Sequence, residues 1–347
     1  MLKRRRLRSP PAVQTSAAGG DYFPQRQQAF THTGCAVLDC ILGGGWLQGS
    51  VINVVGDKST GKTLMAIEAC ANFARQWPRG YMWYREAEAA FDINYASGLG
   101  LPHKRVNFGP KGLDSHWDTV EDVFEDLRKC IDKCKSTGQP GLYVVDSWDA
   151  LTSRAMLSRK VGDAGYNLEK QKITSTELAK LVRDLREARI TLLIISQVRD
   201  RIGFVVGEKH RRSGGKALDF YASQIVWLSH LKTLTQTIKG VKRAYGVRVR
   251  VKCKKNKAAA PSRDAEFTIR FGYGIQDVEA SVGFLEEVKR LDAIGLAKKS
   301  VDDYLDETDN LPGEAYRERA AQVRDCVMSV WSSVESWFKP AHSKYGD

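Results

Sequence analysis

The chain has 347 residues, of which 42% are hydrophobic, and a formal net charge of +13 at pH 7. This length and composition exclude a single small module and a chain that awaits a partner in order to fold. The excess of positive charge favours a polyanionic partner, with nucleic acid first and an anionic membrane second, although charge can also serve solubility alone.

Residues 1–30 carry the basic run Met1–Arg8, then Pro10-Pro11 and Gly19-Gly20, with no sustained helical or strand period. This pattern predicts a flexible basic arm, which can contact phosphates or act as a nuclear-targeting signal. No apolar signal-peptide core follows the basic run, and no later run has the length needed to span a bilayer. We therefore expect a cytoplasmic protein without a membrane partner.

From about residue 31 the chain alternates strand-like and helix-like stretches. This alternation predicts an α/β fold in which a mostly parallel sheet is flanked by helices. Residues 222–270 favour antiparallel hairpins that continue the sheet, and residues 314–338 have helical spacing. We expect a core over residues 31–272 and a small C-terminal domain, helical or α+β, over residues 273–347. The predicted strands are 50–55, 80–84, 141–145 and 190–195, and the predicted helices are 64–77, 119–134 and 175–188.

The seven cysteines include no C-x-x-C pair and the six histidines form no ligand-spaced cluster, so we expect neither a disulfide framework nor a zinc site. Cys130 and Cys134 lie one turn apart in a predicted helix. Two thiols without further ligands are more often buried small side chains than a metal site. Reducing conditions fit this cysteine usage best.

A phosphate-binding loop follows the first predicted strand. The segment Gly56–Thr63 has the G-x-x-x-x-G-K-T spacing and opens a helix, which is the context that a P-loop requires. Backbone N–H groups of such a loop wrap phosphate, Lys62 reaches the β and γ oxygens, and Thr63 binds Mg²⁺. The sequence therefore predicts an ATP and Mg²⁺ site. Its residues are Gly56, Asp57, Lys58, Ser59, Thr60, Gly61, Lys62 and Thr63.

Two carboxylates complete the predicted site. Asp146 ends the apolar strand 142–146 as in a Walker B element that supports Mg²⁺, although an Asp at a strand end can also cap a turn. With the P-loop upstream, metal support is the favoured interpretation. Glu88 lies just past the strand 80–84, where a carboxylate can orient an attacking water, although an acidic loop is often simply solvated.

The segment Glu86–Tyr95 resembles the D-A-E-H-A-L-D-x-x-Y pattern of the bacterial RecA strand-exchange family. The resemblance implies that Glu88 is the catalytic base of an ATPase and that Asp92 and Tyr95 contact the adenine of ATP. Ser147 follows the Walker B aspartate as it does in the family, and the likeness places this serine in the nucleotide site.

Two further segments match the family in order, and the likeness extends over about residues 31–290. The segment Ser196–Arg199 resembles the N-Q-I-R motif, which implies that Gln197 senses the γ-phosphate and signals to DNA. The segment Lys255–Pro261 resembles K-N-K-x-A-A-P. This second match implies that Lys255 and Lys257 reach ATP bound by the neighbouring subunit of a homo-oligomer.

A candidate DNA-binding loop begins two residues after Gln197. The stretch Arg199–Lys216 carries six basic and two acidic residues among glycines. A mobile basic loop joined to a γ-phosphate sensor can couple the nucleotide state to binding of the DNA backbone. Residues 239–263 add ten Lys or Arg and no acid, although a charge run is usually a solvated face.

The same stretch resembles the family's second DNA-binding loop, and residues 157–167 correspond to the first loop, with Tyr166 where the family often has Met. An aromatic ring there can stack on bases. Val206 replaces a family Phe, and the helix after the first loop begins differently, with Glu169-Lys170-Gln171. The resemblance implies DNA contacts by Tyr166, Arg199, Arg201, Ile202, Lys209, Arg211, Arg212, Gly214 and Gly215.

Two features of the family are not recognised in the sequence. One is a helix before residue 31 that docks on the adjacent subunit. The other is an acidic C-terminal tail, and we expect the lack of this tail to ease loading onto DNA. The leading hypothesis is a DNA-dependent ATPase of DNA recombination and repair that polymerises on single-stranded DNA and exchanges strands with a homologous duplex. A paralog that binds DNA or a recombinase without long filaments is the second hypothesis. A hexameric helicase of the DnaB type is third, because it would not predict the Gly214-Gly215 loop exit.

Overall fold

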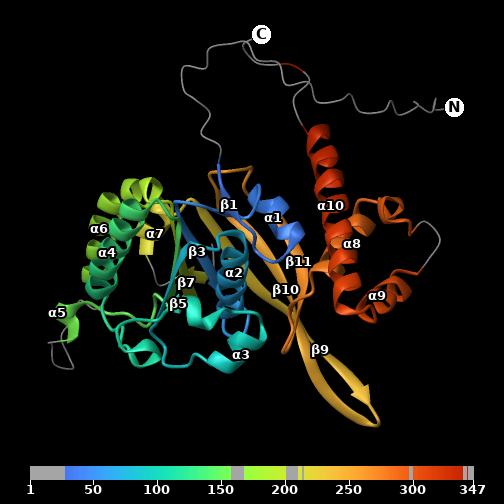
Figure 1. Ribbon diagram of the computed structural model, residues 1–347, viewed down its shortest axis with the longest axis horizontal. Coiled ribbons are helices and arrows are strands. Elements are labelled where there is room, and N and C mark those ends of the chain that lie inside the picture. The colour runs from blue at the N-terminus through green and yellow to red at the C-terminus, as the bar shows by residue number, and fades with distance from the viewer. Residues whose placement is uncertain are drawn as a thin grey trace.

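The structure is a computed structural model that describes residues 28–157, 168–200, 210–212, 215–296, 300–338 and 342. One large sheet forms its centre (Figure 1). The described strands of this sheet follow the order β12-β11-β10-β9-β3-β7-β6-β4-β5, and β8 pairs with β7. Their bounds are β3 Val51–Gly56, β4 Tyr81–Glu86, β5 Val106–Asn107, β6 Gly141–Asp146, β7 Ile190–Asp200, β8 His210–Arg212, β9 Gln224–Ile238, β10 Val241–Asn256, β11 Asp264–Arg270 and β12 Gly274–Ile275.

The sheet is parallel on one side of β9 and antiparallel on the other. Strand β3 pairs in parallel with β7 and β9, and β6 pairs in parallel with β7 and β4. Strands β10, β11 and β12 then add in antiparallel order. This arrangement confirms the predicted α/β fold and the antiparallel continuation after residue 222.

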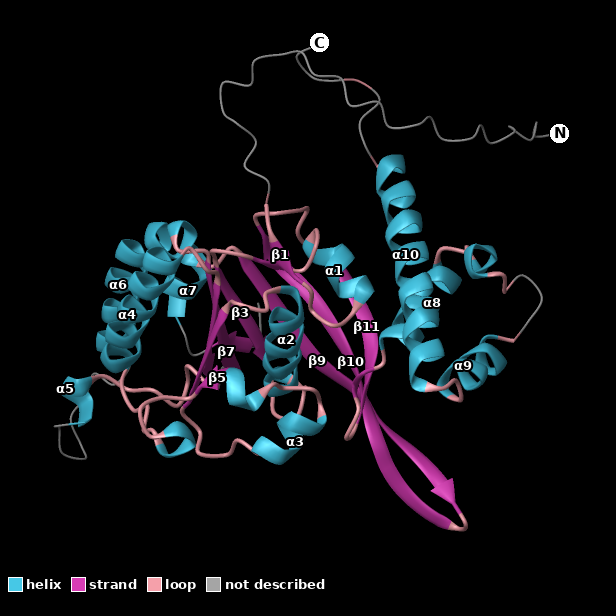
Figure 2. Cartoon of the chain, viewed as in Figure 1, coloured by secondary structure: helices cyan, strands magenta, loops and turns pink. Residues whose placement is uncertain are grey.

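Helices cover both faces of the sheet (Figure 2). Side chains of β3 alternate between the two faces, because Ile52 and Val54 join one apolar cluster with α2, whereas Val51 and Val55 join another with α4 and α6. A strand covered on both faces is apolar throughout, which explains the unbroken hydrophobic run. The helices are α1 Ala36–Leu42, α2 Lys62–Gln76, α3 Ile93–Gly98, α4 Val120–Thr137, α5 Arg154–Leu157, α6 Leu168–Glu187, α7 Gly215–Tyr221, α8 Asp277–Glu287, α9 Val301–Asp309 and α10 Gly313–Trp337, with short 3-10 turns at His103–Arg105, Gly112–Asp114 and Leu291–Ile294.

Two elements are longer than the sequence pattern predicts. Helix α6 begins at Leu168 rather than at residue 175, and strand β7 continues past Ile195 to Asp200. The extension of β7 pairs with β8 through Val198↔Arg212 and Arg199↔Arg211. The backbone of β8 therefore supplies the hydrogen bonds of this end of β7. The pattern of hydrophobic side chains does not predict a strand there.

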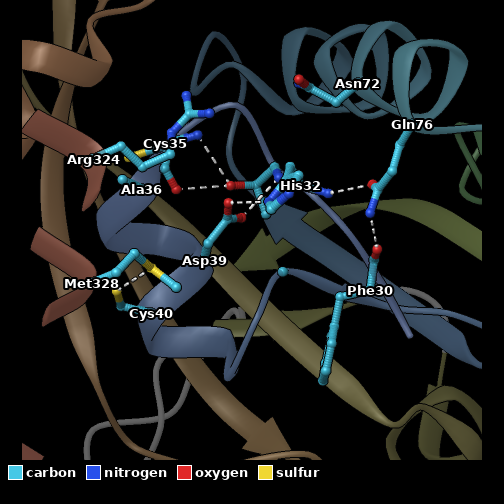
Figure 3. A network of polar contacts seen from close by, with 12 residues as sticks. Phe30, His32, Cys35, Ala36, Asp39, Cys40, Asn72, Gln76, Arg324 and Met328 are labelled. Carbon is cyan, nitrogen blue, oxygen red and sulfur yellow. Dashed lines mark hydrogen bonds and ion pairs between the residues drawn. The ribbon is translucent and has the colours of Figure 1, made fainter. Parts of the chain in front are cut away.

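The N-terminal part of the described chain is fixed by a polar network (Figure 3). Strand β1, Phe30–Thr31, pairs with β2, Trp46–Leu47, and the Phe30 carbonyl accepts a hydrogen bond from Gln76 of α2 over 2.8 Å. The Asp39 carboxylate accepts from the Thr33 N–H over 2.8 Å and lies 3.0 Å from His32 Nδ1. Phe30, which the sequence pattern assigns to the flexible arm of residues 1–30, is therefore part of a paired strand.

The C-terminal helices are joined to the same network and to the core. The Asp277 carboxylate accepts from the Ala36 N–H over 2.6 Å and pairs with Arg324 of α10 over 2.9 Å. Val327 and Val330 of α10 belong to the apolar cluster that contains α2. A smaller cluster joins α8, α9 and α10 to one another. The helix predicted over residues 314–338 is confirmed, whereas the division between domains at residue 272 stays a prediction.

Strands β9 and β10 continue beyond the sheet as a two-stranded ribbon (Figure 2). The two strands pair from Gln224↔Asn256 to Ile238↔Val241, and their outer residues are mostly exposed.

Cys130 and Cys134 of α4 are buried in an apolar cluster, as predicted, and all seven cysteines are free thiols. Among the described residues, no helix has the length and hydrophobicity needed to cross a membrane.

Candidate active site

The loop between β3 and α2 is shaped by two glycines. A Cβ atom at Gly56 would lie 2.6 Å from Thr60 Oγ1, so a larger residue would collide with the loop. Gly61 has a φ of 87°, which favours glycine, and it directly precedes the first turn of α2. The buried Thr60 hydroxyl donates to the Asp57 carbonyl over 2.8 Å and closes the loop. The loop is therefore a preformed cradle at a helix N-terminus, where anions bind favourably.

Lys62 follows the cradle and lies among carboxylates. Its Nζ donates to the Asp57 carbonyl over 2.7 Å. Partial burial lowers the pKa of Lys62, and the negative charges of Asp146 and Glu88 oppose this shift. An ammonium group at this position can exchange the Asp57 carbonyl for a phosphate group bound in the loop.

Asp146 ends β6 and is 5% exposed. The Tyr84 hydroxyl donates to Asp146 Oδ2 over 2.7 Å, and the Thr63 hydroxyl donates to the same carboxylate. Burial raises the pKa of Asp146, and these two hydrogen bonds lower it in part. Thr63 and Asp146 together offer the hydroxyl and carboxylate oxygens that Mg²⁺ uses, with phosphate and water as its further ligands.

Within the described ranges, no group of three or more His, Cys, Asp or Glu side chains could hold a metal ion. The pair Thr63 and Asp146 instead suits an ion that arrives with a nucleotide, because a kinase- or ATPase-type Mg²⁺ is held by one or two protein groups and by phosphate oxygens.

Glu88 joins two other predicted site residues. Its Oε1 atom accepts hydrogen bonds from the Ser147 hydroxyl and from Gln197 Nε2, the latter over 2.9 Å. The structure thus brings together three side chains from separate parts of the sheet: Glu88 follows β4, Ser147 follows β6, and Gln197 lies within β7. The remaining face of this carboxylate is exposed, so it can contact a water molecule beside the P-loop.

Glu86 holds the loop that carries Glu88. Its carboxylate accepts hydrogen bonds from the N–H groups of Glu88, Ala89 and Ala90 over 2.9, 2.9 and 3.2 Å. The Ala87 N–H donates to the Asp146 carbonyl over 2.8 Å. These bonds position the exposed carboxylate through its backbone, a role that the sequence analysis missed because Glu86 stood only as part of a motif.

Gln197 is fixed in a similar way. Its backbone N–H donates to Asp149 Oδ2 over 2.6 Å, while its side chain reaches Glu88. Because β7 continues to Asp200, the segment that holds Gln197 is continuous with the start of the candidate DNA loop. Asp149 was not predicted, because it stands three residues after the Walker B aspartate and belongs to no motif that was recognised.

A buried arginine on the same strand as Glu86 was missed as well. Arg85 of β4 is 1% exposed and pairs with Asp126 over 2.7 Å. Its guanidinium also donates to the Asn107 carbonyl over 2.7 Å and lies 4.4 Å from the centre of the Trp117 ring. The sequence does not predict this role of Arg85. Its partners come from distant segments of the chain, and the residues around Arg85 contain no pattern that indicates them.

The predicted adenine and intersubunit residues occupy separate places. The Asp92 carboxylate caps α3 by accepting from the N–H groups of Asn94 and Tyr95, and the Tyr95 side chain is 43% exposed. Lys255 Nζ donates to the Asp219 and Phe220 carbonyls at the end of α7, over 2.6 and 2.9 Å. Lys257 is exposed, and its N–H donates to the Ser223 carbonyl over 2.9 Å.

The predicted DNA-binding residues are described only in part. The backbones of Arg199, Arg211 and Arg212 form the antiparallel pairing of β7 with β8, and Gly215 begins α7. The two ends of the candidate loop are therefore tied to the sheet and to a helix. Five of the predicted contacts lie outside the described residues: Tyr166, Arg201, Ile202, Lys209 and Gly214.

The sheet order and the glycine loop between β3 and α2 define an α/β protein with a RecA-type core. The family model of the RecA N-terminal domain matches residues 20–276. Protein RecA of Arthrospira platensis is 33% identical over 315 residues, which cover 87% of this chain and 82% of the relative. Protein RecA of Nostoc punctiforme is 36% identical over 268 residues, covering 77% and 70%. The chain belongs to the RecA family.

Proposed function

We propose that the chain is a DNA-dependent ATPase that binds single-stranded DNA as an ATP-bridged oligomer and promotes homologous pairing and strand exchange. The observation that carries this proposal is the 2.9 Å hydrogen bond from Gln197 to Glu88. It joins a carboxylate beside the P-loop to a strand that leads directly into the candidate DNA loop. Membership of the RecA family supports the same function.

In this proposal each polar group at the site has one role. The N–H groups of the loop Gly56–Thr63 bind the phosphates of ATP, and Lys62 stabilises charge on the β and γ oxygens. Thr63 and Asp146 hold Mg²⁺, which neutralises phosphate charge when it is bound. Glu88 orients the attacking water and accepts its proton, while Asp92 and Tyr95 contact the adenine.

Gln197 couples nucleotide to DNA. A γ-phosphate beside the loop competes with Glu88 for the Gln197 amide, so the two ligation states place this side chain differently. Because the same strand continues to Arg199 and Asp200, a shift of Gln197 acts on the base of the candidate loop. The loop then contacts the DNA backbone through its basic residues, as do the residues of the first loop, including Tyr166.

A second candidate function is a RecA paralog that binds DNA or a recombinase without long filaments. The observation in its favour is the contact of Lys255, whose ammonium group is held by the carbonyls of its own chain's α7. An intersubunit role for Lys255 requires that this contact opens when a neighbouring subunit brings ATP. Lys257 is exposed and needs no such rearrangement.

ATP turnover with and without single-stranded DNA tests the proposal, with light scattering on the same samples to report assembly. We expect turnover that DNA stimulates, accompanied by a rise in scattering. Lys62→Ala removes the phosphate contact and Glu88→Gln the proton acceptor, so both variants lose turnover. Stimulated turnover without assembly would favour the paralog, and turnover that is indifferent to DNA would refute the assignment of the Arg199–Lys216 loop.

A further inference from the structure

A groove of about 890 Å³ separates the base of the β9–β10 ribbon from the C-terminal helices. Its walls come from β9 and β10, from the turn between β11 and β12, and from the junction of α9 with α10. Three aromatic side chains line it while remaining exposed: Tyr245 at 38%, Phe271 at 51% and Tyr273 at 46%. Exposed aromatic side chains that gather in one groove indicate a binding surface rather than scattered surface apolar residues.

The wall of this groove that α9 forms is acidic, while Arg270 of β11 also lines the groove. Helix α9 contributes Asp306 and Asp309, and its nine residues hold five carboxylates and no basic side chain. Asp309 lies 3.5 Å from Arg270, whereas the Asp306 carboxylate has no ion-pair partner among the residues that the structure describes. The carboxylates of α9 would repel phosphates and attract a cationic group, so this wall suits a cation better than a nucleic acid. Its chemistry suits a segment that is both cationic and apolar.

The chain contains one segment of this kind outside the described residues. Met1–Arg8 carries five basic residues and two leucines, and Ser9-Pro10-Pro11 follows at once. Arginine stacks on aromatic faces and pairs with carboxylates, and proline-rich segments dock in aromatic-lined grooves at low entropic cost. This segment and the groove are complementary in charge and in apolar character, and neither belongs to the nucleotide site.

The covalent link between them is long enough. A Cβ atom at Gly34 would lie 2.8 Å from one carboxylate oxygen of Glu68, and a Cβ atom at Gly274 would lie 2.5 Å from the other. Gly34 is therefore a near neighbour of Gly274, which adjoins Tyr273 in the groove wall. Residues 28–34 span at most about 20 Å, whereas the sixteen residues from 12 to 27 reach about 55 Å when extended. The network in Figure 3 anchors the starting point of this tether.

We propose that the groove is the docking site of the chain's own N-terminal segment, residues 2–11. The aromatic side chains of Tyr245, Phe271 and Tyr273 receive Pro10 and Pro11, and the carboxylates of α9 pair with the arginines that precede them. A segment tethered to the same molecule is present at a high effective concentration, which favours docking within one chain over docking between two.

Site-specific cross-linking in the full-length protein tests this proposal. The photoreactive residue p-benzoylphenylalanine replaces Leu7, and the cross-linked peptides are mapped by mass spectrometry at a high and a low protein concentration. We expect cross-links to the segment around Phe271 and Tyr273 within one chain, with a yield that does not change on dilution. Cross-links between different molecules that vanish on dilution would overturn the proposal in favour of a second copy, as would cross-links that avoid the groove.

Two pairs of variants separate docking from general effects. Phe271→Ser removes an exposed aromatic side chain of the groove, and we expect the yield to fall about tenfold, the loss of one anchor residue. Its control, Phe338→Ser, removes a 78% exposed ring that does not line the groove and leaves the yield unchanged. Asp306→Asn lowers the yield at low salt, whereas Asp325→Asn on α10 does not. Equal yields in each variant and its control would contradict the proposal.

Discussion

Gln197 Nε2 donates to Glu88 Oε1 over 2.9 Å, although 109 residues separate the two in the sequence. Glu88 is exposed beside the P-loop, and Gln197 stands on the strand whose extension carries the candidate DNA loop. Any change that draws one side chain away alters the other's environment. This single contact therefore offers a physical link between the nucleotide site and the DNA loop.

Replacement of that amide should uncouple the two sites. In Gln197→Ala the Glu88 carboxylate remains, so we expect ATP to bind with nearly unchanged affinity. DNA-stimulated turnover should fall by about 10²-fold, because the link to the loop is lost. Fluorescent nucleotide binding and steady-state turnover measure the two effects. A variant that DNA still stimulates as strongly as wild type would contradict the coupling role.

The buried Walker B carboxylate predicts a specific Mg²⁺ dependence. Asp146→Asn retains an oxygen that accepts from Tyr84 and Thr63 but removes the negative charge. We expect the Mg²⁺ concentration for half-maximal turnover to rise by at least about tenfold. Tyr84→Phe is the matched control, since it removes one hydrogen bond and keeps the charge, and its Mg²⁺ titration should shift much less. Equal shifts in both variants would speak against metal support by Asp146.

Glu68 on α2 predicts a pH effect on stability. Burial raises the pKa of Glu68 from an ordinary value of 4.5 to about 7, and the Ile275 N–H and Arg75 lower it in part. The folded state therefore keeps a proton that the unfolded state has already lost. The stability contributed by this group is fully present below pH 4.5 and is lost as the pH rises through about 7.

Glu68→Gln removes this titration while its amide oxygen still accepts from the Ile275 N–H. We expect the variant to match the wild type near about pH 5 and to exceed its free energy of unfolding by on the order of 2 kcal/mol near about pH 8. Urea denaturation at the two pH values measures the difference. The exposed Glu314→Gln serves as control, and a gain for Glu68→Gln that is the same at both pH values would refute the assignment.

The buried Arg85 predicts a large stability effect away from the nucleotide. Asp126→Ala leaves a guanidinium that is 1% exposed without its carboxylate partner, and we expect a loss of about 3 kcal/mol in the free energy of unfolding. The double variant Arg85→Met with Asp126→Leu should lose less, because no unpaired charge remains buried. Chemical denaturation distinguishes the two, and a double variant that is less stable than Asp126→Ala would show that the pair itself provides the stability.

Much of the site follows from the sequence, because its chemistry imposes short fixed spacings. The P-loop needs glycines and a Lys-Thr pair at the start of a helix, and Asp146 needs an apolar strand before it. Strand and helix periods likewise place most of the core. Contacts between distant segments follow no such spacing, so Arg85 with Asp126 and Asp149 with Gln197 had no signal in the sequence. The early start of α6 at Leu168 also depends on tertiary packing rather than on local pattern.

The most direct test of the central claim is strand exchange itself. Wild-type protein and ATP would be mixed with single-stranded DNA and a duplex labelled with a fluorophore and a quencher on its two strands. We expect a rise in fluorescence with homologous single strands, no rise with heterologous ones, and none with Lys62→Ala. DNA-stimulated ATP turnover without any homology-dependent rise would contradict the claim that this RecA-family chain exchanges strands.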